Sequence, residues 1–71
     1  MRKYSRTPKT LGQKIKKYRM EKSLTQEQVA ERIGVSSTYV GFIEQGQRTP
    51  SIKTADKIAR TLDVKLSDLF D

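Results

Sequence analysis

Residues 25–46 contain the feature that most restricts how this chain can fold: two short amphipathic segments with a glycine, Gly34, between them. Gly34 stands where a left-handed residue commonly ends a helix. Ala30 is small enough to let two helices approach closely across a turn of three or four residues. The apolar positions that would face inward are Val29, Ala30 and Ile33 in the first segment and Val35, Val40 and Ile43 around the second. The sequence therefore predicts a helix-turn-helix pair.

Helix start signals define both ends of this pair and a further helix before it. Thr10 precedes Gln13 by three residues, and Thr25 precedes Gln28 by the same interval. This is the spacing of a capping box, in which each residue bonds the backbone N–H of the other. We therefore expect helices over about 10–22 and 25–33, and a third that begins after Ser36 and ends at Gly46.

The remaining residues predict one more full helix and a short last turn. Apolar residues recur at helical spacing over 51–62, directly after the turn at Pro50. Ser67 is the expected cap of a final turn that carries Leu69 and Phe70. No segment alternates with period two over a useful length, so the predicted fold class is all-α, with four helices and a short fifth.

Composition excludes most kinds of chemistry. The 71 residues form one domain at most, and the sequence has no Cys and no His. The commonest metal ligands, the commonest general base and any disulfide are therefore missing, and no cofactor motif is visible. We expect no enzyme, no metal, no cofactor and no evident small-molecule ligand. No apolar run approaches the roughly 20 residues that span a bilayer, so a cytoplasmic protein is expected.

The positive charge is concentrated at the start of the chain. Residues 1–22 carry nine of the 15 Lys and Arg residues and one of the eight Asp and Glu residues. Such a surface suits phosphate groups, although a solvated arm and helix face is the alternative. Residues 1–9, interrupted by Pro8, are expected to form a flexible basic arm, and residues 10–71 the domain.

Residues 10–70 resemble the phage repressor and Cro type of helix-turn-helix regulator, the XRE family. The resemblance rests on TQEQVAERIGVSSTYVGFIEQG at 25–46, on the following GQRTPS, and on the closing VKLSDLF. It implies a lambda-repressor-like fold that binds double-stranded DNA, with the third helix in the major groove and the start of the second on the DNA backbone. Repression is the expected action, and activation the alternative, because the outcome depends on where the site lies relative to a promoter.

The resemblance also implies a role for individual residues. The expected base contacts are Ser37, Thr38 and Phe42. The expected phosphate contacts are Gln26, Ser36, Tyr39, Gly46, Gln47, Arg48 and Thr49. Arg2, Lys3 and Arg6 of the arm are expected to follow the backbone or enter a groove, and Arg19 is expected to pair with Glu44 inside the protein.

The third helix departs from the family's usual chemistry. Ser37, Thr38, Gly41 and Phe42 offer no side chain that can contact guanine or adenine through two hydrogen bonds. We therefore expect modest sequence specificity, a bias towards A·T-rich sites, and affinity drawn largely from phosphates. Phe42 has the alternative of core or dimer packing. Gly41, which weakens a helix interior, suggests that something closely approaches that face.

Two further expectations concern partners. Leu66, Leu69 and Phe70 are too many large apolar groups for the last residues to bury locally, so they either finish the monomer core or form the contact of a homodimer. A dimer would read two half-sites about one helical turn apart. The competing function is a helix-turn-helix module that binds a protein, such as an antitoxin or a partner-binding regulator.

Overall fold

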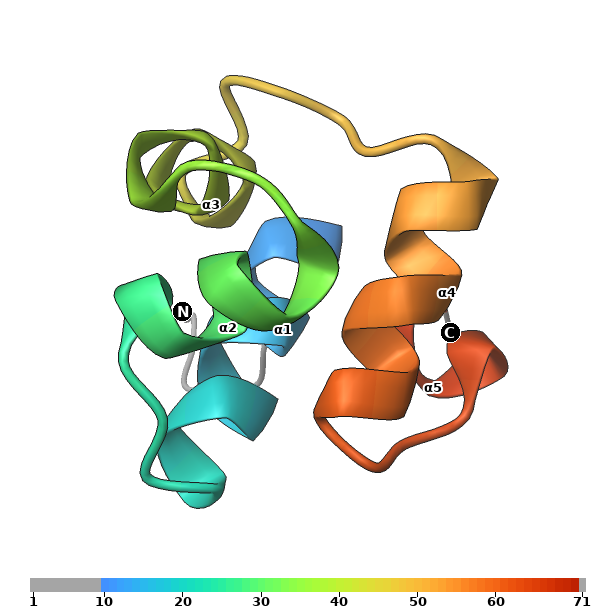
Figure 1. Cartoon of the computed structure of the whole chain (residues 1–71). Coiled ribbons are helices and arrows are strands. Elements are labelled where there is room, and N and C mark those ends of the chain that lie inside the picture. Colours follow the sequence, from blue (N-terminus) through green and yellow to red (C-terminus); the bar gives the residue numbers. More distant parts are fainter. Residues whose placement is uncertain (1–9, 71) are drawn as a thin grey trace, which may run out of the picture.

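The computed structural model describes residues 10–70, which form five α helices (Figure 1). The expected all-α class is confirmed, and no β-strand occurs between residues 10 and 70. The helices are α1 (Leu11–Glu21), α2 (Gln26–Ile33), α3 (Ser37–Glu44), α4 (Ile52–Thr61) and α5 (Leu66–Phe70). The arm expected over 1–9, with Arg2, Lys3 and Arg6, lies outside the described residues.

Both predicted capping boxes are present. The Thr10 hydroxyl accepts the Gln13 N–H at 3.1 Å, and the Gln13 side chain accepts the Thr10 N–H at 3.3 Å. At the start of α2, Thr25 and Gln28 make the same reciprocal pair at 3.0 and 2.8 Å. Each box satisfies two backbone donors that a helix N-terminus would otherwise leave free.

The turn between α2 and α3 has the expected geometry. Gly34 has a φ of 78° and its N–H donates to the Ala30 carbonyl at 2.9 Å, which ends α2. Two residues later the Ser36 hydroxyl accepts the Tyr39 N–H at 3.1 Å and starts α3. A two-residue link, Gly34 and Val35, therefore separates the end of α2 from the cap of α3.

Gly46 ends α3, as the sequence predicts. It has a φ of 80°, and the N–H groups of Gly46 and Gln47 turn back to the carbonyls of Ile43 and Phe42 at 3.1 and 2.8 Å, so the last helical residue is Glu44.

Ser67 is not the cap of the last helix, as the sequence had suggested. α5 already begins at Leu66, and the Asp68 carboxylate accepts the Lys65 N–H at 2.9 Å. The carboxylate three residues on therefore does the capping that the hydroxyl was expected to do.

The core is a single apolar cluster drawn from all five helices. Its largest fully buried side chains are Ile15, Val29, Val40, Ile43, Ile58, Leu62 and Leu69. In Figure 1, α4 and α5 pack together on one side of the molecule, while α1, α2 and α3 form the other side. Each such side chain contributes about 1.5–3 kcal/mol when removed from water, so this cluster is the main source of stability.

Of the large apolar residues at the end of the domain, one completes the core and two remain available for a dimer contact. Leu69 is 1% exposed and packs in the core, so it offers no surface to a second copy. Leu66 is half-buried, and Phe70 remains 50% exposed. Of the three residues expected at a dimer contact, only Leu66 and Phe70 therefore remain accessible.

The described residues hold no group of acidic side chains arranged to bind a metal ion. None of the helices between residues 10 and 70 has both the length and the apolar character needed to cross a membrane.

Candidate nucleic-acid interface

The outer side of α3 carries the three residues expected to contact bases. Thr38 is exposed, Phe42 is 38% exposed, and Ser37 is half-buried. Thr38 and Phe42 lie four residues apart and so share one face of the helix. Core packing, one alternative for Phe42, is wrong, because the ring keeps more than a third of its surface open. The first turn of α3 therefore presents two hydroxyls, with an aromatic ring one turn further on.

The start of α2 lies beside this turn. Gln26 and Ser37 line one shallow depression, together with Thr25 and Glu27. The Gln26 side chain is not free: its amide nitrogen donates to Glu44 Oε1 at 3.0 Å. A side-chain amide has two N–H groups, so one donor of Gln26 remains for the phosphate contact expected of it. Glu44 therefore fixes the direction in which Gln26 can reach out.

Gly41 lies under the same glutamine. A Cβ added at Gly41 would be 3.6 Å from Gln26 Oε1, which is an ordinary contact. The approach expected from the sequence therefore exists, but it is not close enough to exclude alanine.

The ion pair expected between Arg19 and Glu44 is present and buried. Arg19 Nε donates to Glu44 Oε2 at 2.6 Å and Nη2 donates to Oε1 at 3.1 Å, with 11% and 3% of the two side chains exposed. Arg19 Nη1 also donates to the Leu24 carbonyl at 2.8 Å. One guanidinium thus joins α1, the loop before α2 and the last turn of α3. This network neutralises the only buried acid of the described residues.

The loop after α3 supplies a second set of expected phosphate contacts. Its residues from Gly46 to Thr49 are all exposed. The N–H groups of Gly46 and Gln47, expected to bind phosphate, already donate to α3 carbonyls. The side chains that remain to meet a phosphate in this loop are those of Gln47, Arg48 and Thr49.

The two remaining phosphate candidates sit at the start of α3. The Ser36 hydroxyl accepts a backbone bond as the helix cap and keeps its own O–H to donate. Tyr39 is half-buried and packs against the core.

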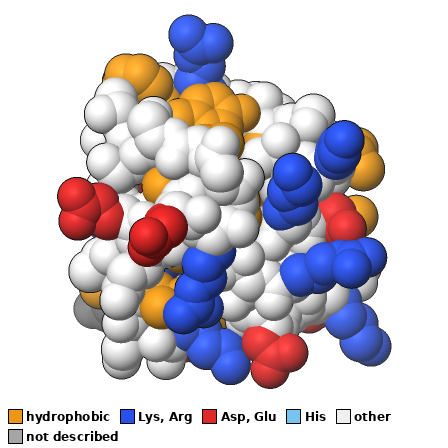
Figure 2. All heavy atoms as spheres, in the orientation of Figure 1, with side chains coloured by type: hydrophobic (Ala, Val, Ile, Leu, Met, Phe, Trp, Pro, Cys, Tyr) orange, Lys and Arg blue, Asp and Glu red, His pale blue; other side chains and the backbone are white. Residues whose placement is uncertain are grey.

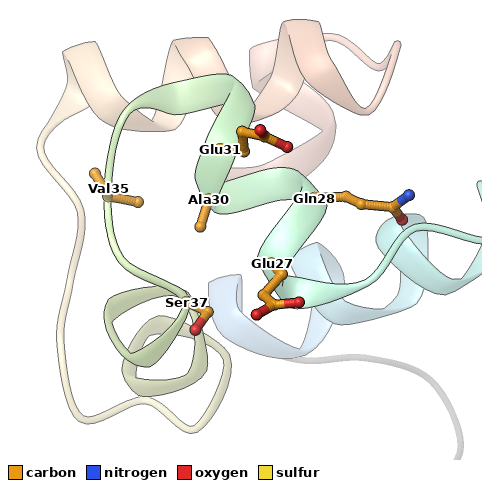
Figure 3. Close-up of a pocket in the computed structure, with 6 residues that line it drawn as sticks. All are labelled: Glu27, Gln28, Ala30, Glu31, Val35 and Ser37. Carbon is orange, nitrogen blue, oxygen red and sulfur yellow. The ribbon is translucent and has the colours of Figure 1, made fainter.

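An acidic groove that the sequence reading did not identify flanks Ser37. Glu27 and Glu31 line it, with Gln28, Ala30, Val35 and Ser37 (Figure 3). Glu27 and Glu31 are four residues apart on α2, a spacing that places like charges on one helix face and is unfavourable. The spacing of these two glutamates is the feature of the sequence from which the acidic groove could have been predicted. A polyanion placed against Ser37 would therefore meet two carboxylates at this edge.

The charges visible in Figure 2 are unevenly distributed. Lys and Arg side chains in this view lie mainly on the half that α4 and α5 occupy, and acidic side chains lie on both halves. On this side of the molecule, the outer surface beside α2 and α3 is therefore not dominated by cations. Hydroxyl and amide groups, rather than a dense basic patch, characterise the exposed start of α3.

Comparison with protein families gives one match that covers most of the chain. The Helix-turn-helix family HTH_3 matches residues 15–69. An uncharacterised helix-turn-helix transcriptional regulator of Archaeoglobus fulgidus is 42% identical over 57 residues, which cover 80% of each chain. The transcriptional regulator SinR of Bacillus subtilis is 40% identical over 62 residues, 86% of this chain and 56% of SinR. The chain thus spans little more than half the length of SinR.

Solved structures give the same picture of the fold. SinR in complex with DNA, described as the master regulator for biofilm formation, matches with a TM-score of 0.82 at 40% identity, covering 87% of this chain and 100% of that chain. The restriction-modification controller protein C.AhdI from Aeromonas hydrophila matches with a TM-score of 0.81 at 38% identity, covering 84% and 91%. The arrangement of the five helices is therefore one that known regulators share.

Proposed function

The chain belongs to the HTH_3 family of helix-turn-helix proteins, and we propose that it is a transcriptional regulator that binds double-stranded DNA through the major groove. One observation carries the proposal: the first turn of α3 holds Ser37 and Thr38 at the surface, directly beside the start of α2. A helix end of this kind fits a major groove about 12 Å wide. A relative with this fold, SinR, is known in a complex with DNA.

The base contacts follow from side-chain chemistry. The hydroxyls of Ser37 and Thr38 can pair with several bases, and the Thr38 methyl or the Phe42 ring can touch a thymine methyl group. None of the three makes a bidentate contact. We therefore expect a short, A·T-biased preference, with each specified base pair contributing about 1–3 kcal/mol.

The phosphate contacts would set the register of the protein on the duplex. Gln26 approaches from the start of α2, where the positive end of the helix dipole favours an anion. Arg48 and Thr49 approach from the exposed loop after α3. Ser36 and Tyr39 are further candidates beside the first turn of α3. Such contacts fix orientation and carry little sequence information.

We further propose that the protein acts as a homodimer through its last helix. Phe70 is 50% exposed and Leu66 is half-buried, and both lie on α5, away from the core position of Leu69. An exposed aromatic ring at a helix end is a natural anchor for an interface. Two copies would read a palindromic site. We propose that the protein binds such a site at a promoter in the cytoplasm and that repression is the result.

The test is selection of bound sequences from a pool of random duplex DNA at two salt concentrations. The intact chain is run beside Ser37→Ala/Thr38→Ala, which keeps the phosphate contacts and removes both hydroxyls. A matched control is Thr61→Ala, which removes a hydroxyl at the end of α4, outside both α3 and the proposed dimer helix. A palindromic motif that the control keeps and the double variant loses supports the proposal.

Two outcomes would count against it. Recovery of no motif, with binding that vanishes as salt rises, would mean that only phosphates are contacted. Unchanged selection by the double variant would mean that α3 is not the reading helix. A module that binds a protein would then be the better account, and the acidic groove of Glu27 and Glu31 beside Ser37 would be the first surface to examine.

A further inference from the structure

At Gly12, α1 meets α3 with backbone against backbone. A Cβ placed on Gly12 would lie 2.2 Å from the Ile43 carbonyl oxygen and 2.7 Å from that of Glu44. Gly12 is buried, and both oxygens belong to the last turn of α3. Because the obstacle is backbone rather than the end of a flexible side chain, no rotamer change relieves it. Only a residue without a side chain fits here.

α1 holds the same turn of α3 at a second point. Gly12 and Arg19 are seven residues apart, which is close to two helical turns and places both on one face of α1. Arg19 binds the Glu44 carboxylate at 2.6 Å, while Gly12 touches the Glu44 backbone. The two contacts together fix both the depth and the rotation of the last turn of α3.

The contact also reaches the loop that follows α3. Gly12 lines a small depression together with Thr10, Ile43, Gly46, Arg48 and Thr49. The start of the loop after α3 thus lies beside the first turn of α1. A shift between α1 and α3 would therefore move the candidate phosphate contacts relative to Gln26, which is on another helix.

We propose that Gly12 is a positioning residue for DNA recognition: its missing side chain sets how far α3 and the following loop stand out from α1. The inference rests on the proposed function, because it assigns Gly12 to the presentation of the same DNA surface. Gly12 itself touches no DNA. It acts through Ile43 and Glu44, whose backbone it supports.

The size of the effect follows from the contact distances. Real Cβ contacts below 3.0 Å are essentially never seen, so alanine at Gly12 must open the 2.2 Å separation by at least 0.8 Å. Binding constellations need their groups held within about 0.5 Å. A donor about 2.9 Å from its acceptor no longer makes a hydrogen bond once it is moved away by about 0.8 Å. Elsewhere in a helix the same substitution is favourable, since alanine is the better helix former.

The experiment compares Gly12→Ala with a matched destabilising control, Ala55→Gly. Ala55 is fully buried on α4, which packs on α2 and α5. Equilibrium affinities of the wild type and both variants are measured for a selected duplex and a scrambled duplex, and each is corrected for the folded fraction. We expect Gly12→Ala to lower the ratio of the two affinities at least tenfold and the control to leave it unchanged. An unchanged ratio for Gly12→Ala overturns the inference.

A stabilised double variant allows the test even if Gly12→Ala alone fails to fold. Ser23 and Asp63 both have a φ of 58°, a left-handed conformation that glycine adopts more readily. Ser23→Gly/Asp63→Gly is therefore a stabilised background in which Gly12→Ala can be examined as a folded protein. Neither position lies on α3 or in the loop after it.

A DNA-free measurement separates this inference from the proposed function. In the stabilised background, Gly12→Ala should change the amide chemical shifts of Ile43 to Arg48 and leave those of α4 in place. If the wild type shows no sequence preference but these shifts move, the proposed function fails and the positioning of α3 by Gly12 stands. If the shifts do not move, the inference fails whatever the DNA result.

Discussion

Breaking the buried ion pair is the sharpest test of how α3 is held. In Glu44→Met, the Arg19 guanidinium, 11% exposed, loses both of its bonds to the carboxylate, and the Gln26 amide loses its anchor. Removing one partner of a buried pair costs about 3–5 kcal/mol, because the other charge stays buried without compensation. A domain of this size is stabilised by about 4–10 kcal/mol in total, so most of the stability is at stake.

The double variant Arg19→Met/Glu44→Met gives the decisive comparison. It removes the second charge as well, so that two apolar side chains of similar length fill the space. The Leu24 carbonyl then loses the Arg19 donor that it holds at 2.8 Å, which costs about 1–3 kcal/mol. We therefore expect the double variant to be more stable than Glu44→Met alone, although less stable than the wild type.

Urea unfolding, followed by far-UV circular dichroism, gives the free energy of unfolding of the wild type and both variants. An unchanged slope of this free energy against urea concentration indicates that unfolding remains two-state. Thermal midpoints should fall by at least about 12 °C for Glu44→Met, since 1 kcal/mol shifts a domain of this size by about 4–8 °C. A loss below about 1 kcal/mol for the single variant would refute the reasoning. So would a double variant that is at least as destabilised as Glu44→Met alone.

Three other predictions follow from the geometry. Ser23→Gly should raise the free energy of unfolding by about 0.5–1 kcal/mol, because Ser23 has a φ of 58°; a lower thermal midpoint would contradict this. Glu27→Gln should strengthen DNA binding several-fold at low salt and less at high salt, because it removes a carboxylate beside Ser37. Glu21→Gln, on α1, serves as its control, and equal gains for both would count against a local effect. Arg48→Ala should weaken binding to selected and scrambled duplexes alike and lower the salt slope by about one; a loss confined to the selected duplex would make Arg48 a base contact instead.

Features that depend on neighbours in sequence were accessible from the sequence. The capping boxes at Thr10 and Thr25, the left-handed Gly34 and the buried face of α2 all follow from local spacing, which is why the helices were placed within one or two residues. Where the expectation was wrong, two local devices competed. Ser67 and Asp68 can both cap the last turn, and the carboxylate does so.

The close approach at Gly12 was missed because it depends on how two helices cross. Spacing alone does give one hint, since Gly12, Ile15 and Arg19 share a helical face. A glycine on the inner face of a helix indicates that something packs directly on its backbone. The sequence does not say which residues do so, because Ile43 and Glu44 are more than thirty positions away.

Of the bonds that join the candidate residues, only the one between Arg19 and Glu44 could be predicted from the sequence. Gln26 was assigned to a phosphate and Glu44 to Arg19, and their bond to each other at 3.0 Å joins the two assignments. The N–H groups of Gly46 and Gln47 were assigned to phosphates and instead end α3. Such partners are set by tertiary packing, which places residues from different helices side by side without leaving a pattern in sequence.

The most direct test of the account is to titrate the labelled protein with a selected duplex and follow its amide chemical shifts. We predict changes at the start of α2, in the first turn of α3 around Ser37 and Thr38, and in the loop that carries Arg48. Resonances of α4 should remain in place, and those of α5 should move only if the copies assemble on the DNA. Changes centred on α4, with the first turn of α3 unaffected, would contradict the claim that this turn reads the DNA.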